Sequence, residues 1–536
     1  MSRTTELRTH LLLAKGYFPT ELPPPFKTNL FADFMNTAAL TVMAAGNPQA
    51  SRFERYSQAR AGHRRRQLGI PNPIHYYITA KTLAENWIKI KKELGKSSLS
   101  ISTPKFVANG DRAISCVPFG DIYEKRALSV QSKKYIVTTD IAQYYPSIYT
   151  HSIPWAIHGK DVCKANLLKK GAAKTKLFGD DIDLSVRNCQ QKQTKGIPVG
   201  PDTSMIISEI IGADIDKNFI QENMDFSGFR YVDDYFLCFR SLPDAEKSLS
   251  KLSHFFSEYE LSPNDVKTDI IESGKFCEPT WSHILSSIDL KVSARKQGRR
   301  LQHLFEEAFK QNINFPEMSV LKYALSCSHA VQVGISNWSI YSSYLLKCAA
   351  SQPSCIDIVT NTIFSYQQLG YPVPYDEIKK FCEDVICAHS PLQHHSEVAW
   401  ALWMSKVLNV SISEKAANCV GDVNSSVCAL LSLDLETKGL VDGALNKSNW
   451  LSRMISAELY EDMWLLAYEA AHKGWLPTRS PYINNHPQFS LLHLGNVSFY
   501  DENQNAIDIL SEKKAKMAEN LSENPFFDLF GGNVYA

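Results

Sequence analysis

The sequence has no long uninterrupted apolar run and no closely paired cysteines. Its first apolar stretch, residues 11–14, stops at Lys15, whereas a signal peptide needs a longer apolar core and a membrane-spanning helix needs about 20 apolar residues. The 12 cysteines include no C-x-x-C pair, which is the spacing typical of zinc sites and thioredoxin-like motifs. We therefore expect a cytoplasmic protein without a membrane span, whose cysteines are small apolar core residues.

The composition is that of a folded protein. Of 536 residues, 44% are hydrophobic and 21% are charged, which excludes long disorder, a collagen-like repeat and a small disulfide scaffold. The net charge of +1 conceals a division: residues 1–300 hold 42 Lys and Arg against 31 Asp and Glu, and residues 301–536 hold 15 against 25. This division predicts a polyanionic partner for the first part of the chain only.

A run of arginines lies near the start of the basic part. Residues 52–66 contain six arginines and a single acid, Glu54, with interleaved aromatic residues. Such a run is either the solvated face of a helix or a surface that contacts nucleic-acid phosphates, and the near absence of compensating acids favours the second. The predicted nucleic-acid-binding residues are Arg52, Arg55, Arg60, Arg64, Arg65 and Arg66.

The predicted secondary structure changes near residue 300. Between residues 71 and 300, strand-like and helix-like segments alternate, as in an α/β or α+β protein. After residue 300, apolar residues recur at helical spacing and strand signals fade. We predict a basic N-terminal extension (1–70), an α+β domain (71–300) and an all-α array of HEAT-like helices with a flexible tail (301–536).

Two segments carry candidate catalytic carboxylates. Residues 229–239 read as a hairpin with Asp233 and Asp234 at its tip, and the β-prone run 135–139 leads directly into Asp140. If the two strands are neighbours in one sheet, the three aspartates meet. Three carboxylates at adjacent strand ends suit two-metal phosphoryl transfer, in which Mg²⁺ ions activate a hydroxyl and neutralise the leaving pyrophosphate.

Between these segments lies a Gly-Pro loop, residues 195–204, which opens a predicted helix. Its Gly200 lacks a side chain and would let a base pair or sugar approach the backbone closely. Taken together, the Asp140 segment, this loop and the tetrapeptide Tyr231-Val232-Asp233-Asp234 resemble the palm of reverse transcriptases. The resemblance implies an RNA-directed DNA polymerase that uses two Mg²⁺ ions, or Mn²⁺, with Ile141 as a further metal-binding position.

The resemblance also implies a set of residues that bind the incoming dNTP. Lys105 and Arg112 would grip the triphosphate from a fingers hairpin, with two solvated cations as the alternative. Tyr145 would pack under the sugar and select deoxynucleotides, or else be a core residue. Lys267 would be a general acid for pyrophosphate, or an ordinary surface lysine.

One residue departs from the usual pattern. Many reverse transcriptases have Pro-Gln-Gly where this chain has Pro198-Val199-Gly200, and valine cannot hydrogen-bond to a template. The acidic C-terminal part is also unlike a basic maturase tail. This combination resembles the abortive-infection (AbiK-like) group of bacterial defence-associated reverse transcriptases. The residues that carry the resemblance are 70–73 (Ile-Pro-Asn-Pro), 196–201 (Gly-Ile-Pro-Val-Gly-Pro), 464–466 (Trp-Leu-Leu) and 474–476 (Gly-Trp-Leu). It implies antiphage defence, homo-oligomers, and DNA synthesis that is protein-primed or uses a non-coding RNA, with Tyr535 as the candidate primer.

Two alternatives remain. One is a retron or group II intron-like reverse transcriptase that copies a structured RNA, against which Val199 and the absent maturase tail argue. The other is an oligomeric RNA-binding scaffold with a silent palm, against which the presence of all three aspartates argues.

Overall fold

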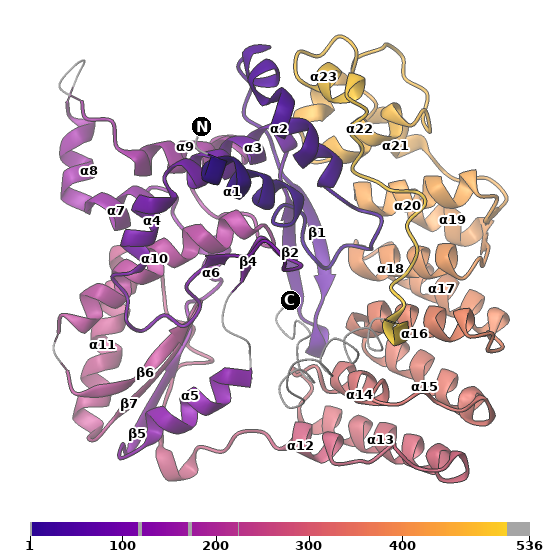
Figure 1. The fold of residues 1–536 in the computed structure, drawn as a ribbon, viewed down its shortest axis with the longest axis horizontal. Helices are drawn as coiled ribbons and strands as arrows, with labels where there is room; N and C mark the ends of the chain where they lie inside the picture. The colour runs from indigo at the N-terminus through magenta and orange to yellow at the C-terminus, as the bar shows by residue number, and fades with distance from the viewer. Residues whose placement is uncertain (1–2, 116–119, 170–173, 223, 512–536) are drawn as a thin grey trace.

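The computed structural model describes residues 3–115, 120–169, 174–222 and 224–511. Figure 1 shows a mixed lobe with the main β-sheet on the left and a column of helices on the right, with strands β1 (Glu54–Ala59) and β2 (Arg65–Ile70) between them. Within the described ranges, no helix is both long and apolar enough to span a membrane.

The central sheet has four strands in the order β6-β7-β5-β8, and all neighbouring pairs are antiparallel. The strands are β5 (Tyr135–Thr139), β6 (Phe226–Tyr231), β7 (Asp234–Phe239) and β8 (Asp269–Glu272). Alternate residues face opposite sides. Phe236 and Cys238 of β7 pack with Ile122 of helix α5 (Gly120–Val130), and Leu237 faces the main core. Helices α10 (Asp202–Ile220) and α11 (Leu242–Glu258) belong to that core.

Short helices and one small hairpin complete the mixed lobe. The hairpin is formed by β3 (Lys105–Phe106) and β4 (Ile114–Ser115). The helices are α3 (Pro73–Glu85), α4 (Trp87–Leu94), α6 (Tyr144–Ser147), α7 (Ser152–His158), α8 (Lys160–Leu167) and α9 (Phe178–Asn188).

The helical column begins before the predicted boundary. Residue 300 lies inside α13 (Ala294–Asn314), so the change in composition there does not mark a break in the backbone. The other helices are α12 (Trp281–Ser286), α14 (Val320–Ser328), α15 (Trp338–Ser351), α16 (Ile356–Gln368), α17 (Tyr375–His389), α18 (His395–Val407), α19 (Glu414–Val420), α20 (Ser426–Thr437), α21 (Ser448–Ser452), α22 (Trp464–His472) and α23 (Phe489–Leu494). A pair of two-residue strands, β9 (Ile412–Ser413) and β10 (Val441–Asp442), interrupts the column.

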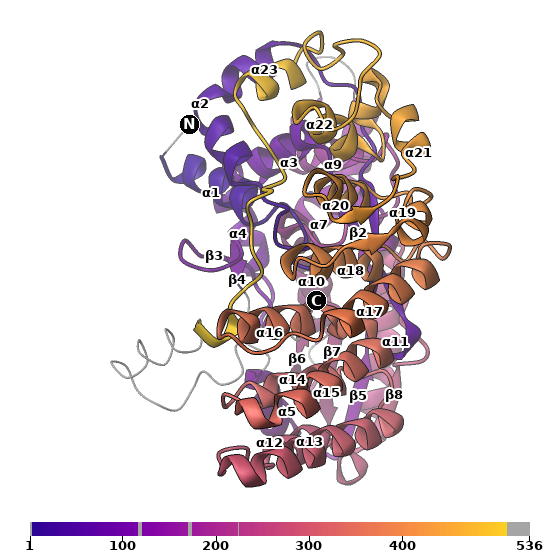
Figure 2. The same ribbon diagram turned by 90° about the vertical axis from the view of Figure 1, so that its right-hand side faces the viewer.

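The first 70 residues join the two lobes, although the sequence predicted a basic extension. Helix α2 (Asn29–Ala44) lies beside α23 in both views (Figures 1 and 2), and helix α1 (Arg3–Ala14) packs on α2 and α3. The end of β2 forms hydrogen bonds with both lobes. Gly69 N donates to Val199 O of the mixed lobe (2.9 Å), and Trp464 Nε1 of the helical column donates to Ile70 O (3.0 Å). Phe26 and Tyr500, which lie outside the strands, form an isolated antiparallel bridge.

Candidate active site

The sheet brings the three predicted aspartates to one edge. Strand β5 pairs with β7 through Thr139 and Tyr235, so Asp140 and Asp234, the next residues outward, lie at the same end of neighbouring strands. Asp233 belongs to the two-residue turn between β6 and β7, because Tyr231 pairs with Asp234. The meeting of these segments, 93 residues apart, therefore follows from the register.

Lys267 lies within this group of carboxylates. Its ammonium donates a short hydrogen bond to Asp140 Oδ2 and lies 3.9 Å from Asp234 Oδ1. Partial burial would lower the pKa of Lys267, but the bond to Asp140 and the charge of Asp234 raise it overall. The lysine therefore carries a positive charge beside the carboxylates, which is the placement that a general acid for pyrophosphate requires.

The carboxylates also fit a divalent cation. Asp140 Oδ1 is buried and has no hydrogen-bond partner among the described residues. Burial, together with repulsion from Asp234 and Asp140, raises the pKa of Asp233 to about 7. A hard cation would supply the missing partner and offset the repulsion between these oxygens, and Mg²⁺ needs only a few protein carboxylates because it keeps several waters.

The backbone around Ile141 is anchored to the segment that carries Lys267. Asn264 N donates to Asp140 O at 2.8 Å, and Ala142 N donates to Ser262 O at 2.9 Å. These bonds hold Ile141, whose metal-binding role remains a prediction, in place beside Asp140.

Tyr145 lies half-buried on α6, five residues after Asp140. Ser208 Oγ of α10 lies 3.4 Å from the Tyr145 hydroxyl, and Ile197 N of the Gly-Pro loop donates to Tyr145 O at 3.0 Å. Burial raises the pKa of Tyr145, and the positive charge of Arg66 lowers it in part. Tyr145 therefore lies between α10 and the Gly-Pro loop, and its sugar-selecting role stays a prediction.

The guanidinium of Arg112 is engaged within the protein, and its predicted triphosphate role stays a prediction. Its Nε and Nη2 donate to Asp202 Oδ1 (2.9 and 2.5 Å), Nη2 also donates to Gly200 O (2.7 Å), and Nη1 donates to Phe18 O (2.7 Å). Asp202 is buried, so releasing the arginine to a triphosphate would leave that carboxylate without its charged partner. Arg112 fixes the β3–β4 hairpin to the Gly-Pro loop.

The space beside Gly200 is also occupied from within the protein, and its predicted role at the dNTP stays a prediction. The residue has a positive φ of 113°, and a Cβ atom there would lie 2.7 Å from Cγ of Pro19. The space left by the missing side chain is therefore taken by the N-terminal segment. Lys15 reinforces this contact by donating to the carbonyls of Ala108 and Gly110 in the hairpin turn. Lys105 is exposed on β3, and its triphosphate role stays a prediction.

The arginine run forms the β1–β2 hairpin rather than a helix, and half of its arginines pair with acids of the helical column. Arg65 donates to both carboxylate oxygens of buried Glu397 (2.6 and 2.9 Å) and to Ser57, so it is engaged within the protein, and its contact with nucleic acid stays a prediction. Arg52 pairs with Glu461 (3.3 Å), and Arg64 pairs with Glu317. Arg55, Arg60 and Arg66 remain predicted nucleic-acid contacts.

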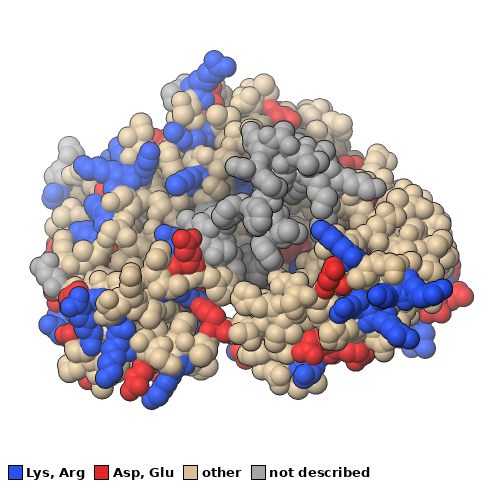
Figure 3. Space-filling view, turned by 60° about the horizontal axis from the view of Figure 1, so that its bottom comes forward, with Lys and Arg blue, Asp and Glu red and all other residues tan. Residues whose placement is uncertain are grey.

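The sequence reasoning missed a second basic surface on α13, which we call the α13 basic face. Its four cations are exposed, and no ion pair involves them in the described part of the chain. They recur at i and i+4, opposite buried Leu301 and Leu304. Figure 3 shows Lys and Arg gathered on the right of its view, the side on which Figure 1 places α13. The face comprises Arg295, Lys296, Arg299 and Arg300.

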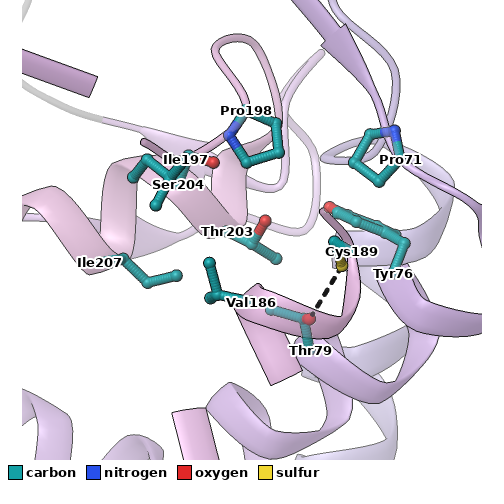
Figure 4. Close-up of a pocket in the computed structure, with 10 residues that line it drawn as sticks. All are labelled: Pro71, Tyr76, Thr79, Val186, Cys189, Ile197, Pro198, Thr203, Ser204 and Ile207. Atoms are coloured by element: carbon teal, nitrogen blue, oxygen red, sulfur yellow. Dashed lines mark hydrogen bonds between the residues drawn. The ribbon is translucent and has the colours of Figure 1, made fainter. Parts of the chain in front are cut away.

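A small pocket lies behind the Gly-Pro loop, and Figure 4 shows its lining from α3, α9 and the start of α10. Tyr76, Cys189 and Pro198 are among the residues that face it, and Thr79 and Cys189 form its one drawn hydrogen bond (3.7 Å). Its mostly apolar lining and the absence of aspartates from it identify a packing gap and not a nucleotide site.

Comparison with known proteins assigns the mixed lobe. Residues 74–304 match the family profile described as reverse transcriptase (RNA-dependent DNA polymerase). The chain therefore contains a reverse transcriptase domain, which confirms the predicted fold class and the predicted enzyme class of nucleotidyltransferase. None of the curated proteins compared matches the chain significantly.

Several solved structures are similar at low identity. Apo telomerase from Candida tropicalis shares 12% identity over 59% of this chain and 62% of that one (TM-score 0.32), and its form truncated from the C-terminal domain shares 14% over 47% and 57% (TM-score 0.29). Telomerase from Candida albicans in complex with a TWJ fragment of telomeric RNA shares 12% over 63% and 68% (TM-score 0.29). The chain thus spans only 57% and 62% of the length of the first two, and similarity at this level carries no inference about activity.

Proposed function

We propose that the protein is a Mg²⁺-dependent DNA polymerase that adds deoxynucleotides to a growing DNA end. The observation that carries this proposal is the cluster of Asp140, Asp233 and Asp234 with Lys267 beside them, inside the matched domain. In this reaction a hydroxyl oxygen bonds to the α-phosphorus of the dNTP while the bond to pyrophosphate breaks. When bound, Mg²⁺ lowers the pKa of the attacking hydroxyl and neutralises the pyrophosphate. Lys267 is placed to give a proton to that leaving group.

Incorporation of labelled dNTPs in the presence of Mg²⁺ tests the activity. We expect incorporation by the wild type and none by Asp233→Asn or Asp234→Asn, because each substitution removes a ligand charge. The matched control is Asp225→Asn, an exposed carboxylate directly before β6 that pairs only with Lys133 and Arg240 among the described residues. Equal incorporation by all four proteins would rule out polymerisation at this site.

We further propose that synthesis does not follow a template in the usual manner. Val199 packs partly buried on the core, its carbonyl accepts a bond from Gly69, and Pro19 covers Gly200. The loop therefore offers no side-chain hydrogen bond on the side where a glutamine would frame a template. Sequencing the product tests this: a copy of an added or co-purified RNA contradicts the proposal, whereas a sequence independent of every RNA present supports it.

The biological setting that we propose is antiphage defence by a homo-oligomer in the bacterial cytoplasm. It rests on the resemblance of the motifs and of the helical C-terminal part to abortive-infection reverse transcriptases. Plaque assays on bacteria that express the protein test it. We expect the wild type to reduce plaque number and Asp233→Asn to lose that effect. Equal protection by both proteins would show that defence does not require polymerisation at this site.

Tyr535 is the proposed primer for protein-linked synthesis, and it lies outside the described residues. Protein priming would leave the new DNA covalently attached to a tyrosine oxygen. After incorporation of labelled dNTP, a denaturing gel of Tyr535→Phe should lack the labelled protein band that the wild type shows. A band of equal intensity would show that Tyr535 is not the primer.

A further inference from the structure

The turn that carries Asp233 has a backbone conformation that its sequence does not favour. Val232 has a φ of +55°, in the left-handed region. Two-residue hairpin turns normally place glycine, asparagine or aspartate at such a position, and a β-branched side chain there is strained. A turn of this kind persists only where its surroundings hold it.

Both backbone groups of Val232 are held from outside the turn. Its N–H donates to Ser102 Oγ at 2.7 Å, and its carbonyl accepts a bond from Arg230 Nη1 at 2.6 Å. Ser102 and Arg230 are both completely buried. The geometry of the turn therefore depends on two side chains that form no hydrogen bond with the carboxylates of Asp233 and Asp234.

Arg230 is itself fixed by two buried carboxylates of α10. It donates to Glu209 (2.9 and 3.2 Å) and to Asp216 (3.0 and 2.9 Å from Nε). Gly212, in the middle of α10, makes room for it, since a Cβ atom there would lie 2.7 Å from the guanidinium carbon. A helix-interior glycine costs stability, and in this helix it accommodates the arginine.

The same network reaches the segment that leads to the β3–β4 hairpin. Ser102 Oγ donates to Glu209 Oε1 (2.7 Å), Ser100 Oγ donates to Glu209 Oε2 (2.8 Å), and Ser97 Oγ donates to Asp216 Oδ2 (2.6 Å). Ser102 thus accepts from the turn and donates to the carboxylate, whereas Ser100 contacts the carboxylate without a bond to the turn.

We infer that Ser102 and Arg230 are positioning residues for the catalytic turn: they hold Val232 in its left-handed conformation so that Asp233 and Asp234 face Asp140. This inference rests on the proposed function of the aspartates. It predicts that weakening either bond to Val232 loosens the turn and impairs metal binding while the rest of the fold survives.

Ser102→Ala tests the inference, with Ser100→Ala as its matched control, because both remove a donor to Glu209 and only the first removes the acceptor for Val232 N–H. We expect hydrogen–deuterium exchange of peptides covering residues 231–235 to quicken about tenfold in Ser102→Ala, and Mn²⁺ affinity, followed by electron paramagnetic resonance, and kcat to fall by a similar factor. Ser100→Ala should stay within about twofold of the wild type. Arg230→Lys should repeat the loss, because lysine lacks the planar fork that bonds three acceptors.

The outcomes separate this inference from the proposed function. If Ser102→Ala and Ser100→Ala behave alike in exchange and in Mn²⁺ affinity, the turn does not depend on Ser102 and the inference fails. If the wild type binds Mn²⁺ through the aspartates yet incorporates no dNTP, the polymerase proposal fails while the exchange and metal measurements still decide the positioning role. Exchange is read locally, so a modest loss of global stability does not obscure it.

Discussion

Removing Arg65 should release the β1–β2 hairpin from the helical column. The side chain of Glu397 is 2% exposed and that of Arg65 is 22% exposed, and the two form a bidentate pair. Arg65→Ala would leave the carboxylate buried without its partner, which typically costs about 3–5 kcal/mol. Ser396 Oγ donates to Glu397 Oε2 at 2.7 Å, and this bond remains after the substitution. We therefore expect a cost near the lower limit, about 3 kcal/mol.

Hydrogen–deuterium exchange measures this cost locally. A loss of about 3 kcal/mol corresponds to an increase on the order of 100-fold in the opening of hairpin amides when exchange reports the opening equilibrium. Peptides that cover residues 54–70 and 395–407 should show it at pH 7.5. The control is Arg64→Ala, whose pair with Glu317 is about half exposed on both sides and should be worth at most about 1 kcal/mol.

The pH dependence gives a second check. Burial alone would raise the pKa of Glu397, but the bonds from Arg65 lower it below its ordinary value of 4.5. The stabilisation from the pair is therefore complete above pH 4.5 and is lost as the pH falls through the lowered value. The difference between wild type and Arg65→Ala should shrink in strong acid. An increase in opening of less than about fivefold at pH 7.5 would refute the reasoning, since it corresponds to only about 1 kcal/mol.

Three further outcomes are expected. Replacing all four cations of the α13 basic face with glutamine should weaken binding of single-stranded nucleic acid and reduce the slope of log affinity against log salt by up to about 3; an unchanged slope would place phosphate contact elsewhere. Burial raises the pKa of Glu54 to about 8, so the wild type should lose stability as pH rises from 4.5 to 8, and Glu54→Gln should melt higher than wild type at pH 8 but not at pH 5. Arg112→Ala should lower the melting temperature and leave the KM for dNTP nearly unchanged. A raised KM with an unchanged melting temperature would instead support the triphosphate role.

Local patterns were sufficient to predict the elements that carry the aspartates. The β-branched run 135–139 forms β5 with the same limits, and the hairpin places Asp233 in its turn. These predictions succeed because a period-two pattern and a polar turn act over a few residues. The left-handed Val232 was not predictable in this way, because its bonds come from Ser102, 130 residues earlier, and from a buried arginine.

The contacts that the sequence did not predict belong to charged side chains whose partners are remote in sequence. Arg112 and Asp202 are 90 residues apart, and Arg65 and Glu397 are 332 apart. A sequence shows that a cation exists but not which acid neutralises it, so both arginines resembled phosphate ligands. The same ion pairs account for part of the opposite net charges of the two parts of the chain. The arginines of β1–β2 and its flanks pair with acids of the helical column.

The position of the first 70 residues has a consequence for biosynthesis. Their partners include Tyr460, Trp464 and Tyr500, which leave the ribosome long after the hairpin does. At about 5–20 residues per second, that interval is roughly 20–90 s. During this time the basic strands are exposed without the acids that later neutralise them. The nascent chain must therefore keep its N-terminal segment free of misplaced contacts until residues 460–500 are made, and the two lobes become one structure only after that point.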